Sequence, residues 1–316
     1  RTKSLKSFLE SESIKPEEPP PLKAKFRRLD SSGPFESDLG NLHDPVQLYV
    51  PSDRYPYKLL VPHFKGLSYL FETDEWQPVA RECKIRNVEI IFPNAHYELD
   101  DGVYVDGTYF IYEDGNVYTY KGNISESSGK WKLSGFFPTD QADDVGVFYE
   151  NGYFYLFGEH GKFLGKPDGT SIALMRSKDG LNNWELIRTN SADPNLEKVE
   201  YGVGDPTIIK VDDTYLMLSD IESKNLPYRI ALWMTKNLQE SFKFYGYPIT
   251  PNWNSKSEWD NYQVQDCDFA PGKSKKKYLI FCNILDIDGI PGGSFLGLKR
   301  YGTRTIGAYR LDLSKR

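Results

Sequence analysis

Aspartates stand immediately before several apolar, strand-forming segments of this 316-residue sequence. Asp44 in "HDPV" and Asp205 in "GDPTI" are each followed by a proline and then by apolar residues. Carboxylates that gather in one place repel one another, which favours a protonated acid beside an ionised base. Such a pair is suited to general acid–base chemistry. Any single Asp at such a place can also cap a turn, because its side chain can bond a nearby backbone amide.

The segments that follow these aspartates predict an all-β fold. From residue 41 onward helical periodicity is nearly absent, and short runs rich in Tyr, Phe, Val and Ile recur between Gly, Asn and Asp turns. Four of the runs align on a tyrosine that follows a turn: Tyr109, Tyr153, Tyr215 and Tyr278. Ten residues before three of these tyrosines stand Asp143, Asp205 and Asp268. The strands therefore repeat as a unit.

Each unit contains a further outer hairpin, such as "SKDGLNNWELI", so that about four strands recur five times between residues 41 and 313. Such repeats are typical of propeller blades. We predict a five-bladed β-propeller with four-stranded blades, with blades over 41–85, 86–138, 139–194, 195–253 and 254–313. A β-sandwich is the competing fold, but it does not explain the repetition. Residues 1–40, rich in Pro and charged residues, are expected to form an extended arm or linker before a propeller domain at 41–316.

In a propeller, the start of each first strand and the end of each second strand meet at one mouth of the central channel. This rule collects Asp44, Asp100, Asp101, Asp143, Asp144, Asp205, Asp266 and Asp268 before the first strands, and Glu159, His160, Asp220 and Glu222 after the second strands. Because these groups come from all five blades, acid–base chemistry is favoured over turn capping for the set. Paired carboxylates of this kind perform glycoside hydrolysis.

Composition limits the classes of partner that are expected for this protein. The net charge of −6 and the lack of Lys/Arg clusters indicate no nucleic-acid partner, and no apolar run approaches the ~18 residues of a membrane span. The three cysteines are expected to be buried thiols. The four histidines show no metal-ligand spacing, and no cofactor is expected. Oligomeric state is not determined by the sequence, and a secreted or periplasmic location is favoured over a cytoplasmic one.

Over residues 41–313 the sequence resembles the five-bladed propeller glycosidases of glycoside hydrolase family 43 and its relatives in families 32, 62, 68, 117 and 130. Blades of these enzymes often open with Asp-Pro. The resemblance implies a general base at Asp44 and an orienting carboxylate at Asp144 in "DVGVF", which lacks the family's proline. The family's acid, a Glu two residues before a proline, is replaced by Gly204, with Asp205 beside it. Some relatives hold a calcium ion in the channel with a fifth-blade histidine, for which this chain has "QDCDF".

These observations predict a glycosidase that cleaves an oligo- or polysaccharide in the channel mouth, with inversion and with water as the nucleophile. Asp44 is the expected base, Asp144 the orienting group and Asp205 the acid, with Glu159, Glu200, Glu222, His96 and His160 as substitutes for the acid. The expected substrate-binding residues are His43, Asp101, Asp143, Glu159, His160, Glu222, Trp259 and Asp268. The alternatives are a non-catalytic carbohydrate-binding propeller and a phosphorolytic enzyme, for which Arg54 and Arg176 are the candidate phosphate ligands.

Overall fold

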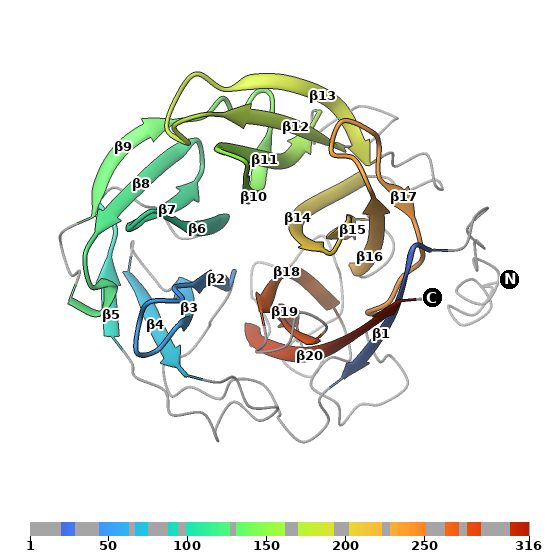
Figure 1. The fold of residues 1–316 in the computed structure, drawn as a ribbon, viewed down its shortest axis with the longest axis horizontal. Helices are drawn as coiled ribbons and strands as arrows, with labels where there is room; N and C mark the ends of the chain where they lie inside the picture. The colour runs from blue at the N-terminus through green and yellow to red at the C-terminus, as the bar shows by residue number, and fades with distance from the viewer. Residues whose placement is uncertain are drawn as a thin grey trace, which may run out of the picture.

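The computed structural model describes residues 20–28, 44–62, 67–74, 88–93, 99–126, 131–161, 170–192, 202–222, 228–250, 263–271, 277–285 and 304–315. Within these ranges every regular element is a β-strand except η3 (Ile124–Glu126), a single turn of 3-10 helix. The strands form five four-stranded sheets arranged around a common axis (Figure 1). The predicted all-β fold with five four-stranded blades is confirmed. No helix of the described residues is long and apolar enough to cross a membrane.

The sheets follow one another along the chain. The first contains β2 (Val46–Tyr49), β3 (Tyr57–Pro62), β4 (Leu67–Thr73) and β5 (Val88–Ile91). The second contains β6 (Asp101–Val105), β7 (Thr108–Glu113), β8 (Asn116–Lys121) and β9 (Lys132–Phe136). Because β5 pairs with β4, the first blade extends to residue 91, beyond the predicted boundary at residue 85.

The third sheet contains β10 (Asp143–Glu150), β11 (Tyr153–His160), β12 (Ser171–Ser177) and β13 (Glu185–Ala192). The fourth contains β14 (Gly202–Val211), β15 (Thr214–Glu222), β16 (Arg229–Thr235) and β17 (Lys243–Phe244). The fifth contains β18 (Gln263–Pro271), β19 (Lys277–Leu285), β20 (Arg304–Lys315) and, on its outer edge, β1 (Leu22–Arg28). The innermost strands are therefore β2, β6, β10, β14 and β18 (Figure 1).

Two-residue turns set the register of several hairpins. Both central residues of the turn have positive φ in Asp106–Gly107, Asp114–Gly115 and Asn151–Gly152. Asx-Gly pairs adopt this conformation at low cost, and the resulting turn matches the twist of the two strands that it joins. The local sequence thus determines these hairpins.

The hydrophobic core is divided into layers between neighbouring sheets. The largest cluster joins the fourth and fifth sheets and includes Leu218, Ile280 and Leu311, all with no exposed area. Three further clusters join the first sheet to the second, the second to the third and the third to the fourth. The second, third and fourth sheets are therefore packed on both faces by apolar clusters, which fixes the positions of their inner strands around the channel.

Part of the predicted N-terminal arm belongs to the propeller. Residues 22–28 form β1, which pairs with β20 in an antiparallel register from Leu22 opposite Lys315 to Arg28 opposite Tyr309. These residues were expected in an extended arm or linker, and the structure shows that this part of the arm is a strand that pairs the outer edge of the fifth sheet. The rest of residues 1–40 lies outside the described ranges, and the proposed division into arm and domain stays a prediction there.

The expectation of buried thiols is also corrected for two cysteines. Cys267 on β18 and Cys282 on β19 form a disulfide, and both side chains are buried. Their 15-residue separation gave no sign of the pairing, because two antiparallel strands bring them together. Cys83 lies outside the described residues.

Candidate active site

Aspartates at the start of the inner strands share an uncommon backbone conformation. Asp44, Asp144, Asp205 and Asp266 have φ between 41° and 45°, in the left-handed region that Asp tolerates better than most residues. In the third, fourth and fifth sheets the strand register shifts at this residue. Such β-bulges re-aim a side chain, and all four of these aspartates line the pocket at the axis.

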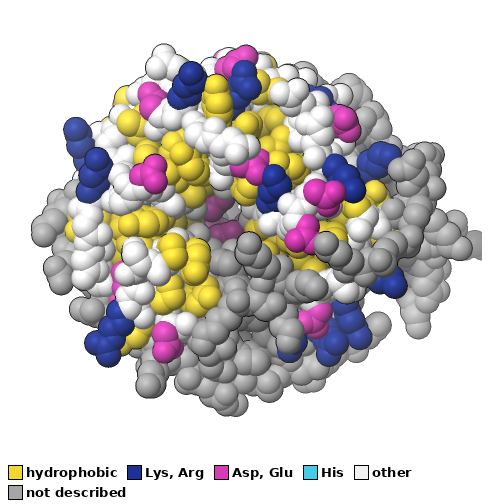
Figure 2. Space-filling view, viewed as in Figure 1, with side chains coloured by type: hydrophobic (Ala, Val, Ile, Leu, Met, Phe, Trp, Pro, Cys, Tyr) yellow, Lys and Arg dark blue, Asp and Glu magenta, His cyan; other side chains and the backbone are white. Residues whose placement is uncertain are grey.

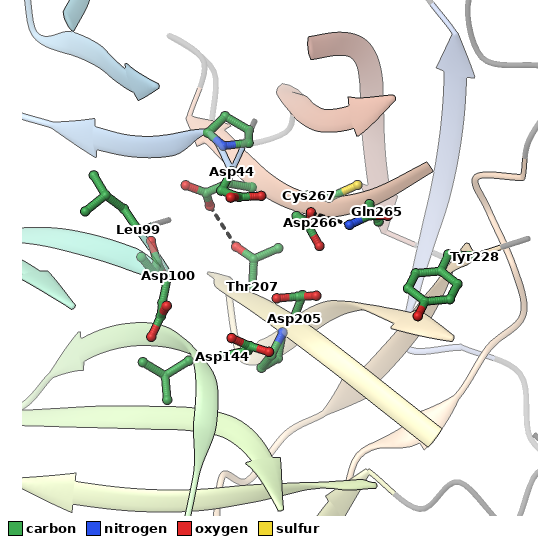
Figure 3. A pocket seen from close by; sticks show the side chains of 15 residues that line it. Asp44, Leu99, Asp100, Asp144, Asp205, Thr207, Tyr228, Gln265, Asp266 and Cys267 are labelled. Atoms are coloured by element: carbon green, nitrogen blue, oxygen red, sulfur yellow. Dashed lines mark hydrogen bonds between the residues drawn. The ribbon is translucent and has the colours of Figure 1, made fainter. Parts of the chain in front are cut away.

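The pocket has a volume of about 250 Å³. Its described lining includes seven aspartates: Asp44, Asp100, Asp101, Asp144, Asp205, Asp266 and Asp268. Figure 3 shows the labelled carboxyl groups around one space, and Figure 2 shows acidic side chains inside the hollow at the centre of the molecule. No Lys, Arg or His is among the described lining residues. The three predicted catalytic residues, Asp44, Asp144 and Asp205, therefore meet in one strongly acidic pocket.

A close approach of two inner strands brings Asp144 next to Asp205. A Cβ added to Gly146 on β10 would lie 1.7 Å from the carbonyl oxygen of Pro206 on β14. Only glycine lets the two backbones come this close. The charge of Asp144 consequently contributes to raising the pKa of Asp205.

Asp205 belongs to a cluster of three carboxyl groups with Asp220 and Asp266. One oxygen from each of the three lies within 4.8 Å of the others. The backbone amide of Asp266 donates to both oxygens of the buried Asp220 at 3.2 Å, and Gln265 Nε2 donates to Asp266 Oδ2 at 2.7 Å. Burial raises the pKa of Asp205 well above its usual value, and the charge of Asp266 raises it further. These surroundings favour the protonated form of Asp205.

Asp100 is a second carboxyl group whose pKa is raised. Burial is the main cause, and the nearby charge of Asp144 adds to it. Its Oδ2 atom is buried without a hydrogen-bond partner among the described residues. A buried carboxylate oxygen of this kind favours the protonated form of the group.

Asp101 and Asp268, both predicted to bind substrate, connect neighbouring sheets. Asp101 Oδ2 accepts from the amide of Val147 on β10 at 2.7 Å. Asp268 accepts from the amide of Gln47 on β2 at 2.5 Å and from the hydroxyl of Thr207 on β14 at 2.8 Å. Burial raises the pKa of Asp268 to about 6. Both residues line the pocket, but their hydrogen bonds already tie the blades together at the axis, and their contact with substrate stays a prediction.

Four other predicted residues are not among the described pocket residues. One lies at the start of a first strand, and three lie near the ends of second strands. Asp143 is exposed and lies opposite the buried Glu159 on β11. His160 is half-buried, and its Nδ1 lies 2.8 Å from the carbonyl oxygen of Gln141. Glu222 ends β15, opposite Gly202, and its side chain lies outside the described part of the structure. Substrate binding by these residues stays a prediction.

Several expectations fall on residues outside the described ranges: His43, His96, Glu200 and Trp259. The two candidate phosphate ligands are described and lie elsewhere. Arg54 lies in the turn after β2, whereas Asp44 lies just before the start of that strand. The Arg54 guanidinium stacks over Tyr55. Arg176 pairs with Glu185 at 2.8 Å. Neither lines the pocket, so the structure removes both as phosphate ligands there.

Asp100, Asp220 and Asp266 had been placed at the mouth by the strand rule, but they were not selected as site residues. Asp143 and Asp268 were predicted because each stands ten residues before a tyrosine, as Asp205 does. The bulges instead give Asp144 and Asp266 the structural position that Asp205 has in its own strand. An irregular register of this kind leaves no periodic trace in the sequence. The left-handed backbone of each Asp is the shared signal, and it is visible only in three dimensions.

The resemblance allows a calcium ion in the channel. The residues that bind it in relatives can be compared with those present here. The histidine that assists calcium in relatives has no counterpart in the described part of the fifth sheet, where Asp266, Cys267 and Asp268 stand. The described residues therefore do not reproduce that site. Carboxylate oxygens are nevertheless calcium ligands in general, so calcium dependence is a control in the experiment below.

Comparison with known proteins rests on structure. No protein-family model and no curated protein matches the sequence. Solved structures match over almost the whole chain. A glycoside hydrolase family 62 α-L-arabinofuranosidase from Coprinopsis cinerea is 11% identical, with 94% of this chain and 98% of that chain covered and a TM-score of 0.60. This chain has the fold of the five-bladed propeller glycosidases.

Two further solved structures have a similar fold. An α-L-arabinofuranosidase from Lactobacillus brevis is 12% identical, covers 89% of this chain and 94% of its own, and has a TM-score of 0.63. A thermostable family 43 glycoside hydrolase is 13% identical, covers 90% and 96%, and has a TM-score of 0.62. At such identities the likeness establishes the fold, and the activities named are those of the neighbours.

Proposed function

We propose that the protein is a glycoside hydrolase that cleaves a glycosidic bond of an oligo- or polysaccharide in the acidic pocket. The observation that carries the proposal is the gathering, at one end of the channel, of carboxyl groups with different protonation tendencies. Hydrolysis of a glycosidic bond needs one carboxylic acid and one carboxylate on opposite sides of the reacting carbon. The fold, shared with glycosidases, is consistent with the proposal.

In this mechanism Asp205 is the general acid. Its pKa is raised well above the usual value by burial and by the charge of Asp266, which favours the protonated form that can donate a proton to the leaving oxygen. Asp205 and Asp266 are hydrogen-bonded through their side chains, and two carboxyl groups can share such a bond only when one carries a proton. Asp266 accepts that proton's hydrogen bond and positions the acid. Gly204, which stands where the family's Glu would be, pairs in β14 opposite Asp220 and has no side chain to contribute.

Asp44 is the general base in this proposal. It activates a water molecule that attacks the anomeric carbon from the face opposite Asp205, and the sugar configuration inverts. Asp144 lies beside Asp205 and orients the site, since its charge acts on Asp205 (Figure 3). A second candidate function is carbohydrate binding without catalysis, which is favoured by Gly204 in place of the family's acid.

The test uses a panel of chromogenic furanosides and pyranosides with the parent protein, Asp44→Asn and Asp213→Asn. Asp213 is 71% exposed in its side chain and pairs with Lys236 in a surface turn, so its variant should retain activity. Removing the base should lower turnover by about 10²- to 10⁴-fold. NMR of the first-formed anomer reports inversion or retention.

Sugar binding by the parent without turnover on any substrate would support the binding function and overturn hydrolysis. The assay is repeated after chelator treatment and with added calcium. Turnover that survives chelation is expected. Turnover that requires calcium would contradict the role of Asp205 as a protonated acid, because a cation in this cluster would keep its carboxylates ionised.

A further inference from the structure

The sequence contains one acceptor pattern for N-linked glycans, Asn123-Ile124-Ser125. This pattern is meaningful only in a protein that passes through a secretory compartment, where it marks a surface loop. The sequence alone favours a secreted or periplasmic location over a cytoplasmic one but does not determine it. The structure adds an independent observation about it.

That observation is the disulfide between Cys267 and Cys282. Both side chains are buried between the two innermost strands of the fifth sheet. Disulfides of this structural kind form in oxidising compartments and are rare in the cytosol. A chain that folds where this bond can form also encounters the enzymes that glycosylate Asn-X-Ser/Thr patterns, if it is made by a eukaryotic cell.

The position of Asn123 is compatible with a glycan. Asn123 is exposed, between the end of β8 and the start of η3. Its backbone carbonyl accepts from the hydroxyl of Tyr120 at 3.0 Å, which fixes the loop. Because β6, β7 and β8 alternate in direction, the end of β8 lies at the face opposite the start of β6, where Asp101 lines the pocket. A glycan there leaves the pocket open.

Ser125, the third residue of the pattern, also has a structural contact. Its hydroxyl is hydrogen-bonded to the buried carboxylate of Glu72 in the first sheet, at 2.8 and 2.9 Å to the two oxygens. In the folded protein this hydroxyl is therefore engaged in hydrogen bonds to Glu72. Glycan transfer, for which the pattern needs the Ser or Thr, therefore precedes the docking of the second blade on the first.

We propose that the protein matures in an oxidising secretory compartment and carries one N-linked glycan, at Asn123, on the face opposite the pocket. In the transfer step Asn123 Nδ2 forms a bond to the anomeric carbon of a lipid-pyrophosphate-linked oligosaccharide. The bond from that carbon to the phosphate oxygen breaks, the lipid pyrophosphate leaves with the electron pair, and the amide nitrogen loses one proton.

The experiment expresses the full chain through the secretory pathway of eukaryotic cells and measures the mass of the secreted and the retained protein. Peptide-N-glycosidase in ¹⁸O-water should remove the glycan and leave one labelled aspartate in place of Asn123. Asn123→Gln should carry no glycan, Ser125→Ala should carry none, and Ser125→Thr should keep it. Asn190→Gln is the matched control, because exposed Asn190 is followed by "SA" and lacks the pattern.

Two results would overturn the proposal: a parent chain without a glycan, or a glycan that remains in Asn123→Gln. Formation of the disulfide on this route is tested on the same samples. Digestion without reduction should yield peptides joined through Cys267 and Cys282, and free thiols at both positions in the secreted protein would contradict the oxidising route. The mass measurement does not depend on whether the protein hydrolyses any glycoside.

Discussion

Chemically identical side chains differ in their tendency to hold a proton within the pocket because their surroundings differ. Asp205 and Asp100 both have raised pKa values, chiefly because burial disfavours the charged form. Asp144 is exposed and acts on both neighbours through its charge. An acid and a base can therefore be built from aspartates alone, which is the residue-scale basis of the proposed mechanism.

Asp205→Asn should distinguish an acid from a binding residue through the leaving group. The variant cannot donate a proton, so hydrolysis of glycosides with alkyl or sugar leaving groups should fall by about 10²- to 10⁴-fold. Nitrophenyl glycosides, whose leaving group needs little protonation, should lose much less. The measurement is kcat/KM across a series of leaving-group pKa values. An equal loss across the series would exclude Asp205 as the acid.

Asp266→Asn should change the pH dependence of the same reaction. The negative charge of Asp266 contributes to the raised pKa of Asp205, so its removal lowers that pKa. The alkaline limb of the kcat/KM profile, where the acid loses its proton, should move to lower pH, and the acidic limb should stay in place. Asp213→Asn serves as the surface control. An unchanged alkaline limb would show that Asp266 does not position the acid.

At the scale of elements, the inner strands are held together by carboxyl groups as well as by apolar contacts. Asp268 on β18 bonds to β2 on one side and to β14 on the other, and Asp101 on β6 bonds to β10. These bonds lie at the axial pocket, where the blades converge. The same groups therefore contribute to pocket charge and to blade contacts.

Asp268 should make stability depend on pH. Because its pKa rises from 3.8 to about 6 on folding, the folded state binds the proton more tightly, and this contribution is present below about pH 4 and lost as pH rises through 6. At about 1.4 kcal/mol per pH unit, the loss is about 3 kcal/mol. Asp268→Asn stays neutral, so its unfolding free energy should gain about that amount relative to the parent between pH 3.5 and 7.5.

Denaturant unfolding at a series of pH values measures this difference. The side-chain amide introduced by Asp268→Asn can still accept from Gln47 and can donate to Thr207, so the variant is expected to fold. A parallel series with Asp213→Asn should track the parent, because Asp213 is exposed on the surface. Parallel curves for the parent and Asp268→Asn would show that Asp268 has no raised pKa in the folded protein.

At the scale of the whole molecule, the two ends of the chain close the ring of sheets. β1, near the N-terminus, supplies the outer strand to β20, near the C-terminus (Figure 1). Leu22 in β1 is buried in the cluster that joins the fourth and fifth sheets. Closure between distant segments couples the blades into one folding unit and leaves the outer edge of β20 paired.

Leu22→Ala should destabilise the protein, whereas Lys23→Ala in the same strand should not. The first removes a buried side chain from the core, at a cost of about 2 kcal/mol or more. The second changes an exposed residue and should alter the unfolding free energy by less than about 0.5 kcal/mol. Urea unfolding measures both. Equal effects would contradict the placement of β1 in the fifth sheet.

Local features made the fold predictable. Asp-Gly and Asn-Gly turns, alternating apolar residues and the recurring tyrosine indicated strands and their five-fold repetition, since each depends on neighbours in sequence. The position of residues 22–28 could not be predicted in this way. Their partner strand begins nearly three hundred residues later, and "LKAKFRR" is too charged to resemble the inner strands.

The candidate site, like the fold, could be predicted from the sequence only in part. The sequence by itself determined that aspartates precede the inner strands, and the propeller rule placed Asp44, Asp144 and Asp205 at one mouth. Only the tertiary structure decided which aspartates the bulges turn inward and which of them hold a proton. A pKa depends on burial and on charges within a few ångströms, and for Asp205 those charges come from neighbouring blades, at positions far away in the chain.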